Sequence, residues 1–263
     1  MSDLGGVWRT VGGRRIFIKD GEDLATAMKN SGKFKSKAKE DEYGFKRIGK
    51  TAIKIDDMSD DYKRDIEDTL EELNNEFNSN LYGVEYSNKE QKEFGNIHMA
   101  QTTGNEYQSK IQFNGFGDKE KFSEMLKDQI KQGNMVDIKE EHYGKYLITH
   151  EFGHSISEFN LTKKQNDEIY TMYREYTLKV ASLEKEIKNK TNEYLFDTSK
   201  INSFNEANEL SKELKQIKIS NYSMSTPSEF VAEAFTDYRL GKEPKEYSKK
   251  VYEYLKEVNK KWD

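Results

Sequence analysis

The sequence predicts an α+β protein whose strands lie in the first half of the chain and whose second half is helical. Residues 51–134 alternate strand-like and helix-like patterns, whereas residues 143–258 carry helical periodicity. Aromatic residues make up 12% of the 263 residues, and 43 basic residues nearly balance 48 acidic ones, so the net charge is only −5. Disordered chains combine few aromatic residues with a high net charge. We therefore expect a folded protein with one large domain and a small appendage.

The composition argues against several classes of protein and of site. The chain has no cysteine, which excludes disulfides, thiolate metal ligands and a cysteine nucleophile. No apolar run is long enough for a transmembrane helix or a signal peptide, so three locations stay open: the cytoplasm, a virion, or export by a non-classical route. The mildly acidic charge balance predicts no nucleic-acid partner, and we expect no membrane partner. The low apolar content, 34%, favours a monomer.

Residues 1–34 are predicted to form a small appendage. Two strand candidates, 7–10 and 15–18, flank Gly12-Gly13 and predict a β-hairpin. A short helix is expected around residues 24–28. An isolated hairpin is only marginally stable in water, so we expect this segment to dock on another structure. The lysine-rich stretch that follows, 35–50, is predicted to be a linker.

The main domain is predicted to span residues 51–263 and to begin with a mixed region. Four strands are expected, at 51–55, 81–86, 96–101 and 107–113. Two helices are expected, at 59–77 and 119–132. The first helix is indicated by apolar residues spaced three or four apart, namely Tyr62, Ile66, Leu70, Leu73 and Phe77.

The remainder of the main domain is predicted to be helical. Four segments are expected: a helix at 143–158, a helical hairpin at 161–218, a helix at 227–240 and a last helix after Pro244. Thr226 and Pro227 stand in the order of an N-cap and a first helical residue, which sets the start of the third segment. The hairpin can shape a substrate cleft, bind a partner or be a structural insertion, and the sequence does not choose among these.

Residues 150–154, His-Glu-Phe-Gly-His, are the strongest functional signal. Residues four apart share a helix face, so His150 and His154 can bind one metal ion. Glu151 lies about a third of a turn away and can reach a water bound to that metal without binding the metal itself. Zinc lowers the pKa of such a water to about 7, and a carboxylate can then take its proton. The alternative is a helix that carries two surface histidines and no metal.

A catalytic zinc site needs a third protein ligand. Ser157 and Asn160 occupy the positions where a metzincin would continue with glycine and histidine. The two other histidines are weak candidates. His98 lies in a predicted strand, and His142 lies among charged residues at the start of a predicted helix. We therefore look for a carboxylate ligand.

The predicted helix at 227–240 offers such carboxylates. Glu229, Glu233 and Asp237 lie at successive turns of one face. One of them could bind zinc, and the next could accept the remaining N–H of a ligand histidine. Taken alone, an acidic stripe on a helix is more often a solvated face. The stripe therefore indicates a metal ligand only in combination with the histidine motif.

These residues together resemble the catalytic domain of the lethal factor family and are similar to the bacterial Pro-Pro endopeptidases. The resemblance rests on the His150–His154 motif, on Tyr222 and on the string Glu-Phe-Val-Ala-Glu-Ala-Phe at 229–235. Both groups are zinc metalloproteases of the gluzincin type. The resemblance therefore implies a zincin-like fold, a bound zinc ion and an endopeptidase that acts on a protein or peptide substrate.

The resemblance also implies a role for individual residues. Glu229 corresponds to the third zinc ligand, Glu233 to the acid that supports a ligand histidine, and Tyr222 to the donor that stabilises the oxyanion. A thermolysin-like register, with Glu233 as ligand and Asp237 as the supporting acid, is the fallback. In that register Thr226, rather than a tyrosine, stands seven residues before the ligand. The substrate would lie extended, and the strand at 107–113 is the expected edge with which it pairs.

The N-terminal segment carries a second, shorter resemblance. The stretch from Val7 to Phe34 resembles a module of minor head proteins of phages and related mobile elements. It implies a structural partner of that kind for residues 1–34. Two functional alternatives therefore stay open: a phage structural or head-associated protein with a non-catalytic zinc site, and an effector or toxin that uses the same protease chemistry in another cell.

Overall fold

The computed structural model describes residues 6–11, 14–19, 37–41, 46–87, 91–93, 96–105 and 107–259. The chain divides into two compact units, Met1–Lys37 and Ala38–Asp263. In the first unit, β1 (Gly6–Val11) pairs with β2 (Arg14–Lys19) in an antiparallel hairpin in which Thr10 lies opposite Arg15. The expected hairpin is therefore present. The short helix predicted around 24–28 lies outside the described residues.

The predicted linker at 35–50 needs a correction, because most of its described residues belong to the second unit. Strands β3 (Lys39–Glu40) and β4 (Lys46–Ile48) form one margin of the main sheet. Ile48 faces the core, whereas Lys39, Glu40 and Lys46 are exposed. Short, charged strands are typical of sheet edges, where they prevent further pairing. A lysine-rich segment can therefore be either a linker or an edge strand of a sheet, and here it contains the edge strands β3 and β4.

The second unit is built on a six-stranded mixed sheet, so the α+β class is confirmed. The strand order is β3-β4-β5-β6-β10-β9. The inner and far strands are β5 (Thr51–Lys54), β6 (Leu81–Ser87), β10 (Gln108–Asn114) and β9 (Ala100–Asn105). Strands β5, β6 and β10 run parallel, and β9 is antiparallel to β10. The zincin-like assignment within this class stays a prediction.

The predicted substrate-binding edge at 107–113 is wrong, because β10 is hydrogen-bonded on both sides, to β6 and to β9. Ile111 and Phe113 are fully buried, as the alternation of this segment requires. The expected strand at 96–101 is divided between two strands, β8 (Asn96–His98) and β9. Of these two, β9 is the strand at the margin of the main sheet. Strand β8 pairs instead with β7 (Gln91–Glu93) in a separate two-stranded ribbon.

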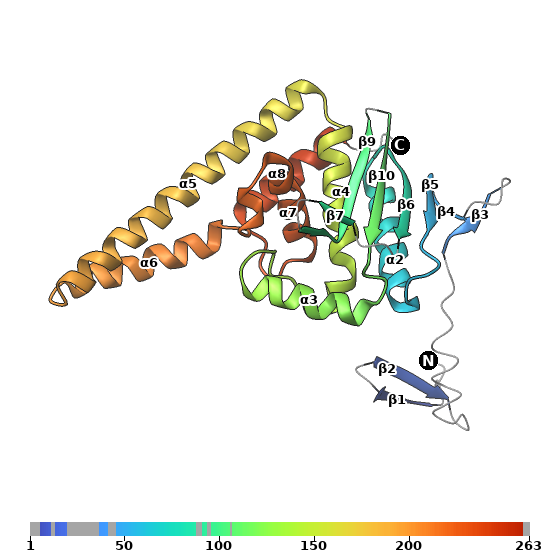
Figure 1. Ribbon diagram of the computed structural model, residues 1–263, viewed down its shortest axis with the longest axis horizontal. Helices are drawn as coiled ribbons and strands as arrows, with labels where there is room; N and C mark the ends of the chain where they lie inside the picture. The colour runs from blue at the N-terminus through green and yellow to red at the C-terminus, as the bar shows by residue number, and fades with distance from the viewer. Residues whose placement is uncertain are drawn as a thin grey trace, which may run out of the picture. The chain divides into compact units, whose positions relative to one another are not determined.

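Seven α-helices lie in the described part of the chain. They are α2 (Asp60–Glu76), α3 (Lys119–Lys131), α4 (Tyr146–Phe159), α5 (Lys163–Phe196), α6 (Ile201–Ile217), α7 (Pro227–Leu240) and α8 (Glu246–Val258). Helix α4 lies between the sheet and helices α7 and α8 (Figure 1). Its expected start at residue 143 is a 3-10 turn, Glu140–Lys145, that leads into the helix. None of the described helices combines the length and the apolarity needed to cross a bilayer.

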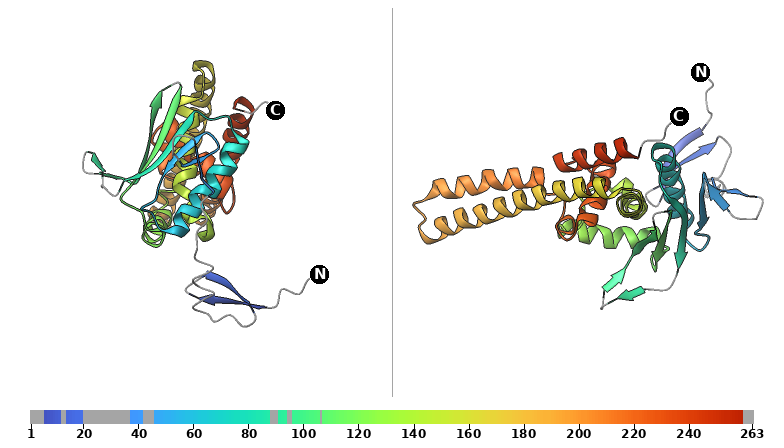
Figure 2. Two further views of the ribbon diagram at one scale, coloured as in Figure 1. Left: turned by 90° about the vertical axis from the view of Figure 1, so that its right-hand side faces the viewer. Right: turned by 90° about the horizontal axis from the view of Figure 1, so that it is seen from above.

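Helices α5 and α6 form the expected hairpin, which extends well beyond the rest of the second unit (Figures 1 and 2). Its base is anchored, because Ile169, Tyr176 and Val180 of α5 are buried. Thr162 caps α5 through a reciprocal capping box with Gln165. The distal end is exposed, with Phe196 91% accessible. The hairpin therefore packs on the main body at its base, through the first half of α5 and the C-terminal end of α6, where Ile217 is buried.

Glu76, at the end of α2, joins three helices. Its carboxylate accepts hydrogen bonds from Arg239 of α7 at 2.6 Å, and from Tyr252 and Lys256 of α8 at 2.7 and 2.9 Å. Partial burial would raise the pKa of Glu76, but the hydrogen bonds from Lys256, Tyr252 and Arg239 outweigh it and lower the pKa to about 2. The ionised form is thus bound more strongly in the folded state than in the unfolded chain.

We expect Glu76→Gln to lower the free energy of unfolding at pH 7 by about 1 kcal/mol, a value that allows for solvent screening of a partly exposed group. Because the folded pKa is depressed, the stabilisation by Glu76 is complete above the ordinary pKa of about 4.5 and is lost as the pH falls toward 2. In urea unfolding measured between pH 3 and 7, the free energies of unfolding of the variant and of the wild type should become equal at low pH. Glu124→Gln, at an exposed glutamate of α3 outside this network, is the control. A stability difference between Glu76→Gln and wild type that does not depend on pH would contradict the assignment.

Candidate metal centre

The two histidines of the motif lie side by side on α4. His150 and His154 are one helical turn apart, both are buried, and their Nε2 atoms are 3.2 Å from each other. The helix is buried along nearly its whole length, from Tyr146 to Ser157. The apolar residues of the segment pack into the core, and the histidines face α7. Two imidazole nitrogens therefore converge on one point.

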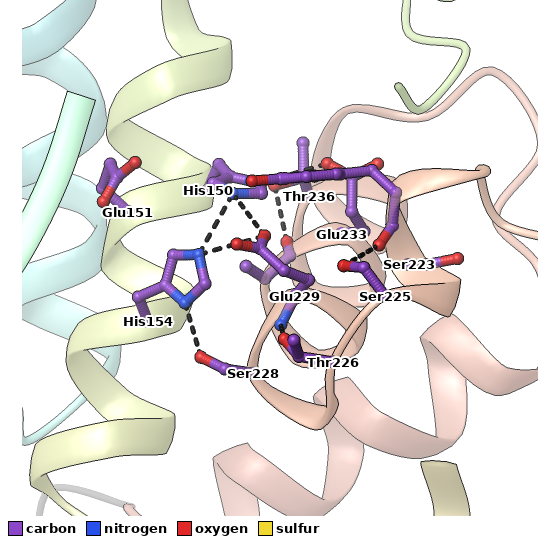
Figure 3. A network of polar contacts seen from close by, with 12 residues as sticks. His150, Glu151, His154, Ser223, Ser225, Thr226, Ser228, Glu229, Glu233 and Thr236 are labelled. Atoms are coloured by element: carbon purple, nitrogen blue, oxygen red, sulfur yellow. Dashed lines mark hydrogen bonds and ion pairs between the residues drawn. The ribbon is translucent and has the colours of Figure 1, made fainter. Parts of the chain in front are cut away.

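Glu229 approaches this point from the first turn of α7. Thr226 is the N-cap of α7 and accepts a hydrogen bond from the backbone N–H of Glu229 at 3.1 Å, and Pro227 is the first helical residue. This start places the Glu229 side chain opposite the histidines. Its Oε2 lies 3.3 Å from Nε2 of His150 and 3.3 Å from Nε2 of His154 (Figure 3).

Helices α4 and α7 approach closely enough for this geometry because of a glycine. A Cβ atom on Gly153 would lie only 2.9 Å from Cα of Ala232 on α7. A real side chain would push the helices apart and move Glu229 away from the histidines. Gly153, the fourth residue of the His-Glu-Phe-Gly-His motif, and Ala232 of the second string thus allow close helix packing. The sequence alone did not assign them this role.

The three converging atoms fit a tetrahedral cation. Donor atoms about 2.0–2.1 Å from such an ion lie roughly 3.3–3.4 Å from one another, and the observed separations are 3.2, 3.3 and 3.3 Å. Oε2 of Glu229 is buried and receives no regular hydrogen bond from the described residues. Within those residues, His150, His154 and Glu229 are also the one cluster of potential ligands close enough to hold a metal ion.

The opposite ring nitrogen of His150 faces the predicted supporting acid. Nδ1 of His150 lies 3.1 Å from Oε1 of Glu233, a carboxylate with no solvent exposure. The hydroxyl of Tyr146, one turn before His150, donates a hydrogen bond to the same oxygen. A carboxylate on Nδ1 fixes the tautomer that directs Nε2 toward a metal. The sequence predicted Glu233 in this place but did not identify Tyr146.

His154 has supporting residues that the sequence did not identify. Its Nδ1 lies 2.7 Å from the Ser228 hydroxyl and 3.2 Å from Oε1 of Glu158. Ser228 also donates a hydrogen bond to Glu158. Glu158 follows His154 by four residues, so helical spacing could have indicated it, whereas Ser228 reaches the ring only through the packing of α7 on α4.

The fallback register does not match this geometry. Glu233 lies on the Nδ1 side of His150, and Asp237, its proposed supporting acid, accepts a hydrogen bond from the Lys245 backbone N–H at 2.7 Å. His142 faces Glu141, 3.8 Å away. The side chain of His98 lies outside the described residues. Glu229 is thus the carboxylate that the fold brings to both Nε2 atoms.

The charges of the cluster are strongly coupled. Burial by itself lowers the pKa of His150, but Glu229 and Glu233 outweigh it and hold the pKa well above its usual range. For His154, Glu158 and Glu229 overcome burial and raise the pKa to about 9. The two histidines in turn outweigh burial of Glu229 and depress its pKa. A cation that binds here must displace protons, so its binding weakens as the pH falls.

Glu151 lies beside the three converging groups and not among them (Figure 3). It is buried, and its carboxylate accepts a hydrogen bond of 2.7 Å from the hydroxyl of Thr102 on β9. The predicted general base therefore lies between the metal cluster and the marginal strand of the sheet. Its position leaves it outside the ligand set, as the motif predicts.

Tyr222 lies on a short 3-10 turn before α7, Tyr222–Met224, with its ring stacked over that of His150 at 6.2 Å between centroids. The side chain is 44% exposed. Burial of the ring and the Glu229 carboxylate raise the pKa of Tyr222 above its ordinary value, so the hydroxyl stays protonated at neutral pH. The predicted oxyanion donor thus borders the cluster and is partly open to solvent.

The base of the helical hairpin holds the segment that carries Tyr222. The Tyr176 hydroxyl of α5 lies 2.7 Å from the Ser223 hydroxyl and accepts a hydrogen bond from the Ile219 backbone N–H at 3.0 Å. Tyr173 donates to the carbonyl of Met224 at 2.8 Å. The base of the hairpin therefore supports the segment that carries Tyr222.

Comparisons of this chain with protein-family models, with curated proteins and with solved structures find no match.

Proposed function

We propose that this chain is a zinc-dependent endopeptidase of the gluzincin type, related in its catalytic machinery to the lethal factor family and the Pro-Pro endopeptidases. One observation carries the proposal. Two histidine nitrogens and one carboxylate oxygen converge at tetrahedral separations, and a further carboxylate, Glu151, lies beside them. A structural zinc site normally has four protein ligands, whereas a catalytic site has three and an open position. The three ligands found among the described residues favour the catalytic kind.

In this mechanism each residue has a separate task. His150, His154 and Glu229 would hold the zinc, which would supply Lewis-acid chemistry at the scissile bond. Glu151 takes a proton from the attacking water and delivers it to the leaving amine, so the protons balance when the peptide bond breaks. The Tyr222 hydroxyl donates a hydrogen bond to the oxygen on which negative charge develops.

The proposed substrate is an extended protein or peptide segment. With β10 inside the sheet, the strand available for pairing near the site is β9, which contacts α4 through Thr102. Addition of a substrate strand at a sheet margin is a common mode of peptide recognition. A substrate bound in this way would lie between β9 on one side and the Tyr222 segment on the other.

Tyr222→Phe is expected to lower kcat by about 100-fold to 1,000-fold, the usual cost of losing one oxyanion donor. Zinc content should not change, because the phenol is not one of the three converging ligands. Steady-state kinetics and metal analysis of the purified variant would check both. Tyr170→Phe, at an exposed tyrosine of α5, is the matched control. An unaltered kcat would remove Tyr222 from the mechanism.

The decisive test combines elemental analysis with cleavage of a diverse peptide library, read by mass spectrometry. We expect one zinc ion per chain and a set of cleaved peptides that share a sequence preference. Zinc without any cleavage would favour the second candidate, a phage head-associated protein with a non-catalytic metal site. Absence of zinc after reconstitution would refute the metal centre. An effector or toxin role shares the same chemistry and differs only in its target.

A further inference from the structure

Thr102 connects the marginal strand of the sheet to the proposed general base. Its hydroxyl oxygen lies 2.7 Å from Oε2 of Glu151 and 3.0 Å from the backbone carbonyl oxygen of the same residue. A hydroxyl has one proton to donate, and the shorter contact is to the ionisable carboxylate. Bonds from a hydroxyl to a carboxylate are among the stronger hydrogen bonds in proteins.

We propose that Thr102 is a positioning residue that fixes the orientation of the Glu151 carboxylate. With Oε2 held by the threonine, Oε1 is the oxygen that can receive a proton from the attacking water. The inference rests on the proposed peptidase function, and it assigns a role to a strand residue outside the histidine motif and the downstream acidic string.

The surroundings make this hydrogen bond rigid. Thr102 pairs with Ile111 of β10, so its backbone is part of the ladder. One helical turn after Glu151, the Ser155 hydroxyl lies 2.6 Å from the hydroxyl of Ser109 on β10. Strands β9 and β10 therefore each contact α4 through a side-chain hydroxyl. A β-branched side chain also has few χ1 rotamers, which limits the positions that the Thr102 oxygen can take.

This placement couples two requirements of the proposed reaction. Strand β9 is the last strand of the six-stranded sheet, and it is where an extended substrate would pair. The same strand holds the general base through Thr102. Strand β9 would therefore set both the register of the substrate and the orientation of the Glu151 carboxylate. Loss of the Thr102 hydroxyl should impair the chemical step more than substrate binding.

The catalytic test uses the zinc-loaded full chain and three variants. Thr102→Val removes the hydroxyl and nearly keeps the shape of the side chain. It should lower kcat by about tenfold to 100-fold, which is part of the usual contribution of a positioned base. KM should change by less than about twofold, and the zinc content should stay the same. Thr102→Ser keeps the hydroxyl and should restore most of kcat. Thr171→Val, at an exposed threonine of α5 outside the proposed site, is the matched control.

A second test needs neither zinc nor activity. Urea unfolding midpoints of the metal-free chain would be compared for Thr102→Val, Glu151→Ala and the double variant. We expect Thr102→Val to shift the midpoint clearly when Glu151 is present and much less in the Glu151→Ala background. Additive shifts would overturn the inference, because the two side chains would then not interact in solution.

The two tests separate this inference from the proposed function. A wild-type protein that cleaves nothing refutes the peptidase, and the unfolding cycle still decides whether Thr102 holds Glu151. An active wild type with an unchanged kcat in Thr102→Val overturns the positioning role. A rise in KM alone also overturns it, because Thr102 would then act on substrate pairing and not on the base.

Discussion

Glu151→Gln is expected to abolish peptide cleavage while zinc stays at one ion per chain. Glutamine keeps the size of the side chain and one acceptor oxygen, but its amide cannot take a proton at neutral pH. A positioned general base contributes about 100-fold to 10,000-fold to the rate, so kcat should fall by at least that much. Glu151 lies beside the three converging ligands without joining them, which is why the metal should remain.

Cleavage of a peptide found in the library, followed by mass spectrometry together with metal analysis, would measure both quantities. Glu186→Gln, at an exposed glutamate of the helical hairpin, makes the same chemical change far from the motif and should behave as wild type. Substantial cleavage by Glu151→Gln would exclude this residue as the base. Loss of zinc together with activity would show that Glu151 supports the ligands, and the assigned division of roles would be wrong.

Glu229→Gln and Glu233→Gln are expected to differ sharply in zinc affinity. Oε2 of Glu229 faces Nε2 of both histidines at 3.3 Å, whereas Oε1 of Glu233 lies on the far side of the His150 ring, 3.1 Å from Nδ1. Loss of a residue that supports a ligand typically costs about 10-fold to 100-fold in metal affinity. Glu233→Gln should fall in that range, and Glu229→Gln should lose more, because a charged ligand is removed.

Competition with a chelator of known affinity, at fixed pH, would rank the variants. The pH must be held constant because protons compete with the metal for the two histidines. Circular dichroism of the metal-free proteins would confirm that both variants fold. A larger loss of zinc in Glu233→Gln than in Glu229→Gln would favour the thermolysin-like register, with Glu233 as ligand, over the register proposed for this chain.

Local periodicity was sufficient to predict the helices and most strands. The spacing of Tyr62, Ile66 and Leu70 predicts α2, and all three are fully buried. Thr226 and Pro227 mark the start of α7 correctly. Both patterns depend on neighbours within one or two turns, which the chain specifies without reference to distant segments. The spacing of His150 and His154 belongs to the same class, because one helix alone brings the two rings together.

The sequence by itself therefore determined the α+β class, the paired histidines and the set of carboxylates from which a third ligand could come. Packing between distant segments decided the rest. The order in which the strands of residues 81–114 pair, β6-β10-β9, places β9 rather than β10 at the margin of the sheet. Helices α4 and α7 pack closely at Gly153 and Ala232. In that packing Glu229 faces both Nε2 atoms, and Glu233 faces Nδ1 of His150. Thr102 and Tyr146 reach the site across such contacts, and no local pattern encodes which side chains meet when two elements pack.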